Sequence, residues 1–506
     1  MRTIINMALS LYTVRIVLMA LGQNDYGIYS LVAGVVSMLA FVTNSLVVTT
    51  QRFVSFYQGQ GNSTAVHRIF NNSLIIHIVL GTLVVAVLLI LSSFLFNGFL
   101  NIPPERLDAA IFVYRTVVLM LLLSFITAPF RALLISHENI VYISMIDVLD
   151  GILKVVIVTM LLHVSYDKLE FYGIMMTAIQ LFNFIALSLF CFTHYTECSC
   201  PSLRLFSRND LRELLSFAGW NVYGTGCIVG RQQGTAVILN RFIGAAVNAA
   251  YGIAFQISSY TNFLSSSLSN AIAPQIVKSE GSGDRQRALR LSHTTCKFMF
   301  FLLSAIGIPY IFEAQGILEW WLNDVPENTA LFCVMVMSAS LADSLTIGLV
   351  HINQAIGKIA PYIIFINTPK LLSLLPIYLC LAFGHGLLTV AVIYVCMELF
   401  SAIIRLPFLQ RTANLSVRTF LREVTAMEIT PAVICIITCI IFTFIFQFRY
   451  RFVATFALSI PVYAMAIYAF GLTTYERGII QNIHRQIATR VSVAVFSLKR
   501  PTKRRA

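Results

Sequence analysis

Charged side chains interrupt the long apolar segments of this chain at several positions. Each of them requires a reason, because a charge at the centre of a bilayer costs about 2.5–3.5 kcal/mol on insertion scales. The bases in these segments are Arg15, Arg115, Lys154, Arg231 and Lys370, and the acids are Asp147, Asp150, Asp343 and Glu398. A guanidinium group holds phosphate oxygens through paired hydrogen bonds, and an ammonium adds a point charge. Several bases facing a wet cavity therefore predict a site for an anionic headgroup, with phosphate first.

Two arginines are the strongest candidates for contacts with such an anion. Arg231 has no acid within a helical turn and lies near the middle of its segment, with Gln232 and Gln233 beside it and Asn240 about two to three turns further on. Arg15 lies within the first apolar segment. An unpaired guanidinium at this depth is hard to explain by structure alone, so we predict that both arginines contact a ligand.

Two further bases occupy positions that favour contact with water. Lys370 follows Pro369, where we expect a helix break that lets freed carbonyl groups and the ammonium face a cavity. Arg52 stands at the inner mouth of its segment. There it would either meet an arriving anion or anchor the helix among the lipid headgroups.

The charges of residues 141–163 allow a simpler interpretation. Asp150 and Lys154 are four residues apart in the sequence, and Asp147 shares their helical face. Lys154 would therefore contribute to the anion site or form an ion pair within its own helix. If a proton or cation is coupled, it would use Asp150, Asp343 or Glu398.

Apolar segments account for most of the chain. Hydrophobic residues make up 58% of it, charged residues only 11%, and its mean hydropathy is +0.81, whereas a soluble protein carries about a quarter charged residues. A helix needs roughly 20 residues to cross a bilayer. On that basis we place about fourteen spans near 3–21, 27–49, 74–96, 111–130, 141–163, 172–193, 217–240, 248–272, 296–313, 329–352, 360–382, 387–408, 430–447 and 452–472.

Lysine and arginine collect in every second loop between these spans. About 25 basic residues fall on one side and about five on the other, so both ends of the chain are predicted to be cytoplasmic. The net charge of +13 is therefore mostly topological, and we expect no nucleic-acid partner, despite the basic clusters that such binding requires. The basic tail, 473–506, predicts an amphipathic helix on the anionic inner leaflet, or a tail without fixed structure.

One cluster of possible metal ligands, His194, Cys198 and Cys200, lies in a predicted inner loop. It lacks a fourth ligand nearby, and its spacing differs from that of the usual zinc sites. We therefore expect neither a metal nor another cofactor.

Residues 21–62 and 243–284 form an internal repeat. Leu21-Gly22 corresponds to Ile243-Gly244, and Gly59-Gln60-Gly61-Asn62 corresponds to Gly281-Ser282-Gly283-Asp284. The copies lie an even number of spans apart and so cross the membrane in the same direction, as in transporters built of two parallel halves; chance similarity is the alternative. Duplication predicts an N-lobe (1–195), a cytoplasmic linker (196–216), a C-lobe (217–410), two further helices (427–472) and the tail (473–506).

The repeat also identifies a span that hydropathy would miss. Residues 248–272 are rich in hydroxyl and amide side chains, among them Gln256 and Asn262. Such a helix needs polar partners from other helices or from water. We predict that this span and its counterpart, 27–49, line a wet cavity suited to sugars, with tight packing between helices as the alternative.

The sequence resembles the polysaccharide transporters of the multidrug, oligosaccharidyl-lipid and polysaccharide exporter superfamily over essentially its whole length. The resemblance is carried by Tyr12-Thr-Val-Arg15, Asp25-Tyr26-Gly27-Ile28-Tyr29, Thr50-Gln51-Arg52-Phe53, Gly219-Trp220-Asn221, Asn248-Ala249-Ala250-Tyr251-Gly252-Ile253-Ala254 and Pro274-Gln275-Ile276. It implies an all-α polytopic membrane protein with two lobes of about six helices around a central cavity, two C-terminal helices and alternating access.

The same resemblance implies a function and partners. Such flippases move undecaprenyl-diphosphate-linked oligosaccharides, including O-antigen units of lipopolysaccharide, to the outer leaflet of the bacterial inner membrane. Membrane lipids and polysaccharide assembly proteins, such as a polymerase, would be further partners. The role of diphosphate contact would fall on Arg15, Arg52 and Arg231.

We therefore predict a flippase or exporter and not an enzyme. A cation-coupled multidrug antiporter of the same superfamily is the nearest alternative, but its cavity should be dominated by acids. A membrane glycosyltransferase or polymerase would need an acid/base or metal-binding group, commonly on a sizeable outer loop, and the predicted outer loops are short.

Overall fold

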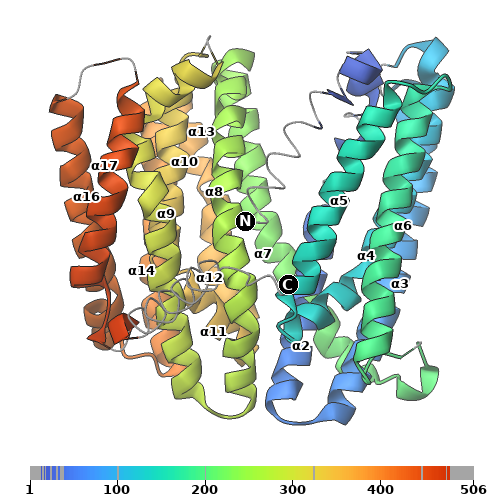
Figure 1. Cartoon of the computed structure of the whole chain (residues 1–506), viewed down its shortest axis with the longest axis horizontal. Coiled ribbons are helices and arrows are strands. Elements are labelled where there is room, and N and C mark those ends of the chain that lie inside the picture. The colour runs from blue at the N-terminus through green and yellow to red at the C-terminus, as the bar shows by residue number, and fades with distance from the viewer. Residues whose placement is uncertain are drawn as a thin grey trace, which may run out of the picture. The chain divides into compact units, whose positions relative to one another are not determined.

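The computed structural model describes residues 13, 16–17, 19–22, 25–29, 32–34, 39–99, 102–199, 201–322, 325–445, 448, 450–474 and 476–478, and every regular element among them is a helix. Figure 1 follows these helices in chain order by colour. They are α2 (Ala40–Gly59), α3 (Ser63–Phe94), α4 (Leu107–Ser136), α5 (Ile140–Leu161), α6 (Lys168–His194), α7 (Arg208–Phe242), α8 (Ala245–Gly281), α9 (Arg285–Leu322), α10 (Thr329–Ser344), α11 (Gly348–Ile356), α12 (Ile359–Leu372), α13 (Leu374–Ala382), α14 (Leu387–Ala413), α15 (Val417–Phe420), α16 (Ala426–Ile445) and α17 (Arg451–Ala466).

The helices confirm the prediction of an all-α, multi-pass membrane protein. Eight of those described are long and apolar enough to cross a membrane, and up to nine if α10 and α11 are one span bent by 51°. From the third predicted span onward, each span coincides with a helix or with a broken pair of helices. The polar α8 fails the apolarity test, as its composition predicts, yet it continues for 37 residues. Most of the first predicted span, 3–21, and nearly all of the basic tail lie outside the described residues.

Contacts between residues divide the chain into two units. Unit 1 comprises residues 1–296 and 326–415, and unit 2 comprises residues 297–325 and 416–506. Most of α9 therefore groups with α16 and α17, whereas the sequence analysis placed it in the C-lobe. Within unit 1, α4 packs against α3 and α6, and within unit 2, α16 packs along α17 (Figure 1). The boundaries of the two lobes stay a prediction.

The two glycine-rich turns of the repeat have the same hydrogen bonds, residue for residue. In residues 60–62 and again in 282–284, three successive amides donate to the carbonyl groups four, three and five residues before them. Gly61 (φ +68°) and Gly283 (φ +83°) take the left-handed conformation that ends a helix. The side chains of Asn62 and Asp284 then accept an amide hydrogen bond in the first turn of the next helix. This match in geometry supports duplication over chance similarity.

Helices α2 and α8 approach each other closely at these turns. A methyl group added to Gly59 would overlap the carbonyl oxygen of Lys278, and one added to Gly281 would overlap the carbonyl oxygen of Phe56. Lys278 and Gly281 are the repeat counterparts of Phe56 and Gly59. The contact is therefore isologous, meaning that the same patch of each copy meets the other, and the charge pattern predicts that it lies at the cytoplasmic ends of both helices.

An ion pair reinforces this contact beside Gly59. The ammonium of Lys278 donates to Glu138 at 3.0 Å, and the side-chain amide of Gln275 donates to the same carboxylate at 3.0 Å. Partial burial alone would raise the pKa of Glu138, but these two hydrogen bonds, together with the positive charges of Lys278 and Arg287, outweigh burial and lower its pKa below the ordinary value. Because the folded-state pKa is the lower one, the pair contributes at neutral pH and is lost only as the pH falls through the carboxyl range.

Replacing either glycine should weaken the contact between the two copies. We expect Gly59→Ala and Gly281→Ala each to lower the free energy of unfolding by about 1–3 kcal/mol, because the added methyl group meets backbone that cannot move aside alone. The double variant should lose less free energy of unfolding than the two single variants lose together, since both changes open the same contact. Thermal unfolding of the detergent-solubilised protein measures all three. Gly219→Ala is the matched control, because Gly219 lies within α7 with no atom near its added methyl group; an equal loss there would contradict the assignment.

Candidate functional site

Five charged side chains of unit 1 form one continuous network. Arg231 of α7 pairs with one carboxylate oxygen of Glu398 of α14. Lys370 of α12 donates to the other oxygen of Glu398 at 2.5 Å and lies 3.4 Å from Asp343 of α10. Arg405 of α14 donates to Asp343 at 2.7 Å. The network therefore joins four helices that are far apart in the sequence.

A bend between two helices and a short irregularity in another span lie beside these groups. Asp343 lies at the end of α10, directly before the 51° bend into α11. Lys370 lies in the last turn of α12, and one residue, Ser373, separates α12 from α13. Backbone hydrogen bonds continue across Ser373, so residues 359–382 form one span and the break expected after Pro369 is limited to this residue. Broken helices free backbone groups and are tolerated in membranes where they face protein or a wet cavity.

The network contains more N–H donors than its two carboxylates can bind. Three bases face two acids, which leaves one positive charge. Nε and Nη1 of Arg231 and Nε of Arg405 are buried and have no hydrogen-bond partner in the described part of the chain. The Arg231 guanidinium also lies 4.0 Å from the ring centroid of Tyr394. Buried donors of this kind call for an anion or ordered water.

A cavity of about 310 Å³ opens against the network. Asp343, Lys370 and Arg405 line it. The other polar side chains of its wall are hydroxyl, amide and imidazole groups, including Asn221, Thr225, Ser269, His351, Asn353 and Asn367. Such a wall offers both donors and acceptors, as the hydroxyl groups of a sugar require.

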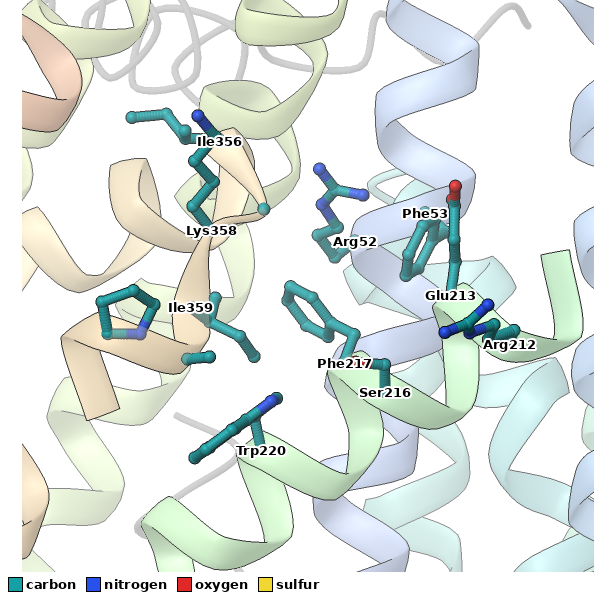
Figure 2. Close-up of a pocket in the computed structure, with 13 residues that line it drawn as sticks. Arg52, Phe53, Arg212, Glu213, Ser216, Phe217, Trp220, Ile356, Lys358 and Ile359 are labelled. Atoms are coloured by element: carbon teal, nitrogen blue, oxygen red, sulfur yellow. The ribbon is translucent and has the colours of Figure 1, made fainter. Parts of the chain in front are cut away.

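A second cavity, of about 570 Å³, is lined by α2, α7 and the link between α11 and α12. Figure 2 shows Arg52, Arg212, Lys358 and Trp220 around it. Arg212 and Lys358 are exposed, and Glu213 is the acid among the lining residues. Ile359 lines this cavity and the smaller one as well, so the basic cavity adjoins the one beside the network.

The side chain of Arg52 is hydrogen-bonded to the backbone of α11. Its Nε donates to the carbonyl oxygen of Gln354 at 3.1 Å and its Nη2 to that of Ala355 at 3.0 Å. These carbonyl groups belong to the last turn of α11, where no further helix amide follows to bond them. The guanidinium also lies 4.5 Å from the ring centroid of Phe53. Neither interpretation from the sequence, anion contact or headgroup anchor, included this capping of a helix that belongs to the predicted C-lobe.

The structure does not bring Lys154 and Asp150 to this network. They form an ion pair of 2.7 Å on α5, and Asn183 donates to Asp150 at 2.7 Å. Asp147 pairs with Arg131 of α4 at 2.9 Å. The charges of α5 are therefore explained by pairing within the N-terminal half of unit 1.

The remaining predicted contacts lie elsewhere or are not described. Asn240 and Gln256 are exposed and do not belong to the network. Arg15 and the side chain of Asn262 lie outside the described residues. Some hydroxyl groups of α8 bond neighbouring helices, as Ser269 does with His351 at 2.7 Å, which is the packing alternative. Among described residues no three metal-ligating side chains cluster, and Cys200 is not among them.

One expectation about the site was wrong and one residue was missed. Arg231 is not unpaired, because Glu398 reaches it from a helix 167 residues away in the sequence. Arg405 lies inside α14 and within the predicted span 387–408, but it was not among the charges singled out from the sequence. Arg405 follows Glu398 by seven residues, which places both side chains on one helical face. This spacing was the signal in the sequence that could have identified Arg405 as part of the site.

Neutralising Glu398 should destabilise the fold strongly. Glu398→Gln leaves two buried cations without their shared partner, and we expect the free energy of unfolding to fall by about 3–5 kcal/mol. Adding Lys370→Met should recover part of this loss, because one uncompensated charge is removed. Asp150→Asn, which disrupts the partly exposed α5 pair, should cost about 0–1 kcal/mol. Thermal unfolding compares the variants, and equal losses for Glu398→Gln and Asp150→Asn would show that the network is solvated.

Comparison with known proteins identifies the fold. No family model and no curated protein matches the sequence, whereas many solved structures match the coordinates. A MATE protein in a straight conformation has a TM-score of 0.71 at 14% identity, over 83% of this chain and 95% of its own. An outward-facing multidrug resistance MATE family transporter of the MOP superfamily has a TM-score of 0.71 at 14% identity, over 82% and 94%.

A third similar structure is a MOP superfamily transporter from Pyrococcus furiosus, with a TM-score of 0.69 at 14% identity over 83% of this chain and 94% of its own. The TM-scores establish a shared fold. Identities this low leave the specific polysaccharide transporter family as a proposal. The chain is an integral multi-pass membrane protein with the fold of the MOP superfamily transporters.

Proposed function

We propose that this protein is a transporter that moves a polyprenyl-diphosphate-linked oligosaccharide across the bacterial inner membrane, with both of its termini in the cytoplasm. The observation that carries the proposal is the buried excess of positive charge, with guanidinium N–H groups that have no described partner, beside a polar cavity. A diphosphate supplies both the negative charge and the acceptor oxygens that this arrangement lacks. Membrane lipids and polysaccharide assembly proteins are its expected partners.

The basic cavity at the ends of α2 and α7 fits the first encounter with such a substrate. Arg212 and Lys358 are exposed and attract an anionic headgroup over a distance set by ionic strength. Trp220, with Phe217 beside it, presents an aromatic surface of the kind on which sugar rings stack. The cavity beside the network, which shares Ile359, would then receive the diphosphate.

In an alternating-access mechanism, the isologous contact between α2 and α8 would open and close during transport. In this conformation α2 and α8 meet at Gly59 and Gly281, at the ends predicted to be cytoplasmic. A cytoplasmic substrate would enter after these ends separate and leave outward once they have closed. Export of negative charge is favoured by a negative cell interior, by about 2.3 kcal/mol per charge per 100 mV.

The charges of the network favour this function over cation antiport. Both acids of the network, Asp343 and Glu398, already pair with two bases each, so an arriving cation would have to displace a base. The Pyrococcus furiosus transporter is described as having a binding pocket of reversed polarity that suggests a different function. The excess of bases here is a further reason to expect an anionic substrate.

The test is transport by protein reconstituted in liposomes, with a fluorescent polyprenyl-diphosphate oligosaccharide in one leaflet. We expect the wild type to move the lipid, and Arg212→Gln together with Lys358→Gln to slow the initial rate about three- to tenfold, equivalent to about 1 kcal/mol. The defect should shrink as salt is raised, because exposed charges are screened. Melting temperatures should stay unchanged, since both side chains are exposed.

Arg115→Gln is the matched control, because Arg115 is exposed and lies at the predicted outer end of its span. It should transport like the wild type. Failure of the wild type to move the lipid, combined with proton- or sodium-driven efflux of an organic cation from the same liposomes, would replace this proposal with the antiporter. Equal rates for all variants would remove the basic cavity from the pathway.

A further inference from the structure

Unit 2 contains a buried carboxyl group that has no hydrogen-bond partner among the described residues. Glu428, in the first turn of α16, is 0% exposed. Neither of its carboxyl oxygens bonds a described group. A carboxylate left in this state carries a large desolvation penalty, so the side chain requires either a proton or a positive partner.

Two other carboxylates of unit 2, the buried Glu313 and the partly buried Glu476, show how this unit pairs a charge. Glu313, 2% exposed, accepts hydrogen bonds from Arg451 at 2.9 Å and from Thr455 at 2.8 Å. Glu476 accepts from Lys297 at 2.7 Å, and from the amide and hydroxyl of Thr473 at 2.8 and 2.9 Å. Burial would raise the pKa of Glu476, but these donors lower it below its ordinary value. Glu428 therefore departs from the pattern of its own unit.

Among the described residues, a cation acts on Glu428. Lys297 of α9, itself 3% exposed, attracts the Glu428 carboxylate electrostatically while donating to Glu476. From α17, Tyr463 faces the same region, with its hydroxyl 2.5 Å from that of Ser304. Cys435, two turns along α16, is the other ionisable group nearby. An ammonium carries three N–H groups, so Lys297 has donors for a second acceptor.

Backbone irregularities lie on both sides of this carboxyl group. A π-helical turn, η4 (Leu421–Thr425), ends three residues before Glu428, and another, η5 (Ile467–Gly471), follows α17. Gly471 packs so closely on Phe301, with the Met427 carbonyl beside it, that an added methyl group would overlap the Phe301 ring. Single π turns inside helices frequently mark functional sites. Here both π turns pack against α16, the helix that carries Glu428.

We propose that Glu428 is a proton-binding site in which Lys297 is shared between Glu428 and Glu476. With the proton bound, Glu428 is neutral and Lys297 pairs with Glu476. When the proton leaves to water on the cytoplasmic side, the O–H bond breaks and its electron pair stays on the carboxylate. Lys297 then donates to Glu428 as well, and Glu476 keeps its donors from Thr473. The three side chains together change from no net charge to one negative charge.

A proton suits this site better than a metal cation does. A metal would stand beside the Lys297 ammonium and be repelled by it. In addition, no three side chains of the metal-binding types gather anywhere in the described part of the chain. The inference concerns unit 2 alone and is independent of the substrate proposed above.

Infrared spectroscopy of the full-length protein in lipid nanodiscs tests the proposal directly. We expect the wild type to show the carbonyl stretch of a protonated carboxyl group at neutral pH, and to lose it as the pH is raised. Glu428→Gln should lack this band. In Lys297→Met the band should persist to higher pH, because the cation that stabilises the Glu428 carboxylate is gone. We expect the proton affinity of Glu428 to rise at least tenfold, which moves the midpoint of the titration by about one pH unit.

Glu313→Gln is the matched control, since it is the same change at an equally buried glutamate of the same unit. It should keep the band but lower the melting temperature, because Arg451 loses its partner, whereas Glu428→Gln should leave the melting temperature unchanged. A band that survives in Glu428→Gln, or that never titrates in the wild type, would overturn the proposal. If Glu428→Gln does not fold, the shift in Lys297→Met decides, and an unchanged titration there refutes the shared lysine.

Discussion

The cost of holding charge away from water organises the interior of unit 1. Arg231, Lys370 and Arg405 are each nearly fully buried, and no single helix supplies the acids that would balance them. The network therefore forces α7, α10, α12 and α14 together around Asp343 and Glu398. Removing one member of such a set costs far more than removing an exposed pair, because the remaining charge is left uncompensated. Packing in this half of the protein is thus tied to the same groups that face the cavity.

The sequence was sufficient for the fold and for the types of residue at the site, but not for their partners. Apolar length, alternating loop charge and the repeat identified the helices, including the polar α8. Charges inside spans identified Arg231, Lys370, Asp343 and Glu398, all of which meet in one network. Pairing across helices is set by tertiary packing, so Arg231 was wrongly expected to lack an acid. Arg52 was harder still, because its acceptors are backbone carbonyl groups, and these carry no signal in the sequence.

The two units resolve the problem of buried charge in opposite ways. Unit 1 holds more buried bases than acids in its network, with guanidinium N–H groups that lack described partners. Unit 2 holds a buried acid without a donor, beside a lysine that already serves another carboxylate. An excess of positive charge attracts an anion, whereas an unsatisfied carboxyl group is relieved by a proton. The two features therefore point to different ligands.

Arg52 connects the contact between the repeat copies to the charge network. It lies on α2, two turns before Gly59, and it caps the last turn of α11. Helix α11 follows directly on the bend after α10, where Asp343 pairs with Lys370 and Arg405. Separating α2 from α8 must therefore either break the hydrogen bonds of Arg52 or carry α11 along with α2. In the first case buried carbonyl groups lose their donor, and in the second the bend beside Asp343 has to move. If α11 moves with α2, the state of the contact at Gly59 and Gly281 would alter the surroundings of the charges at the cavity.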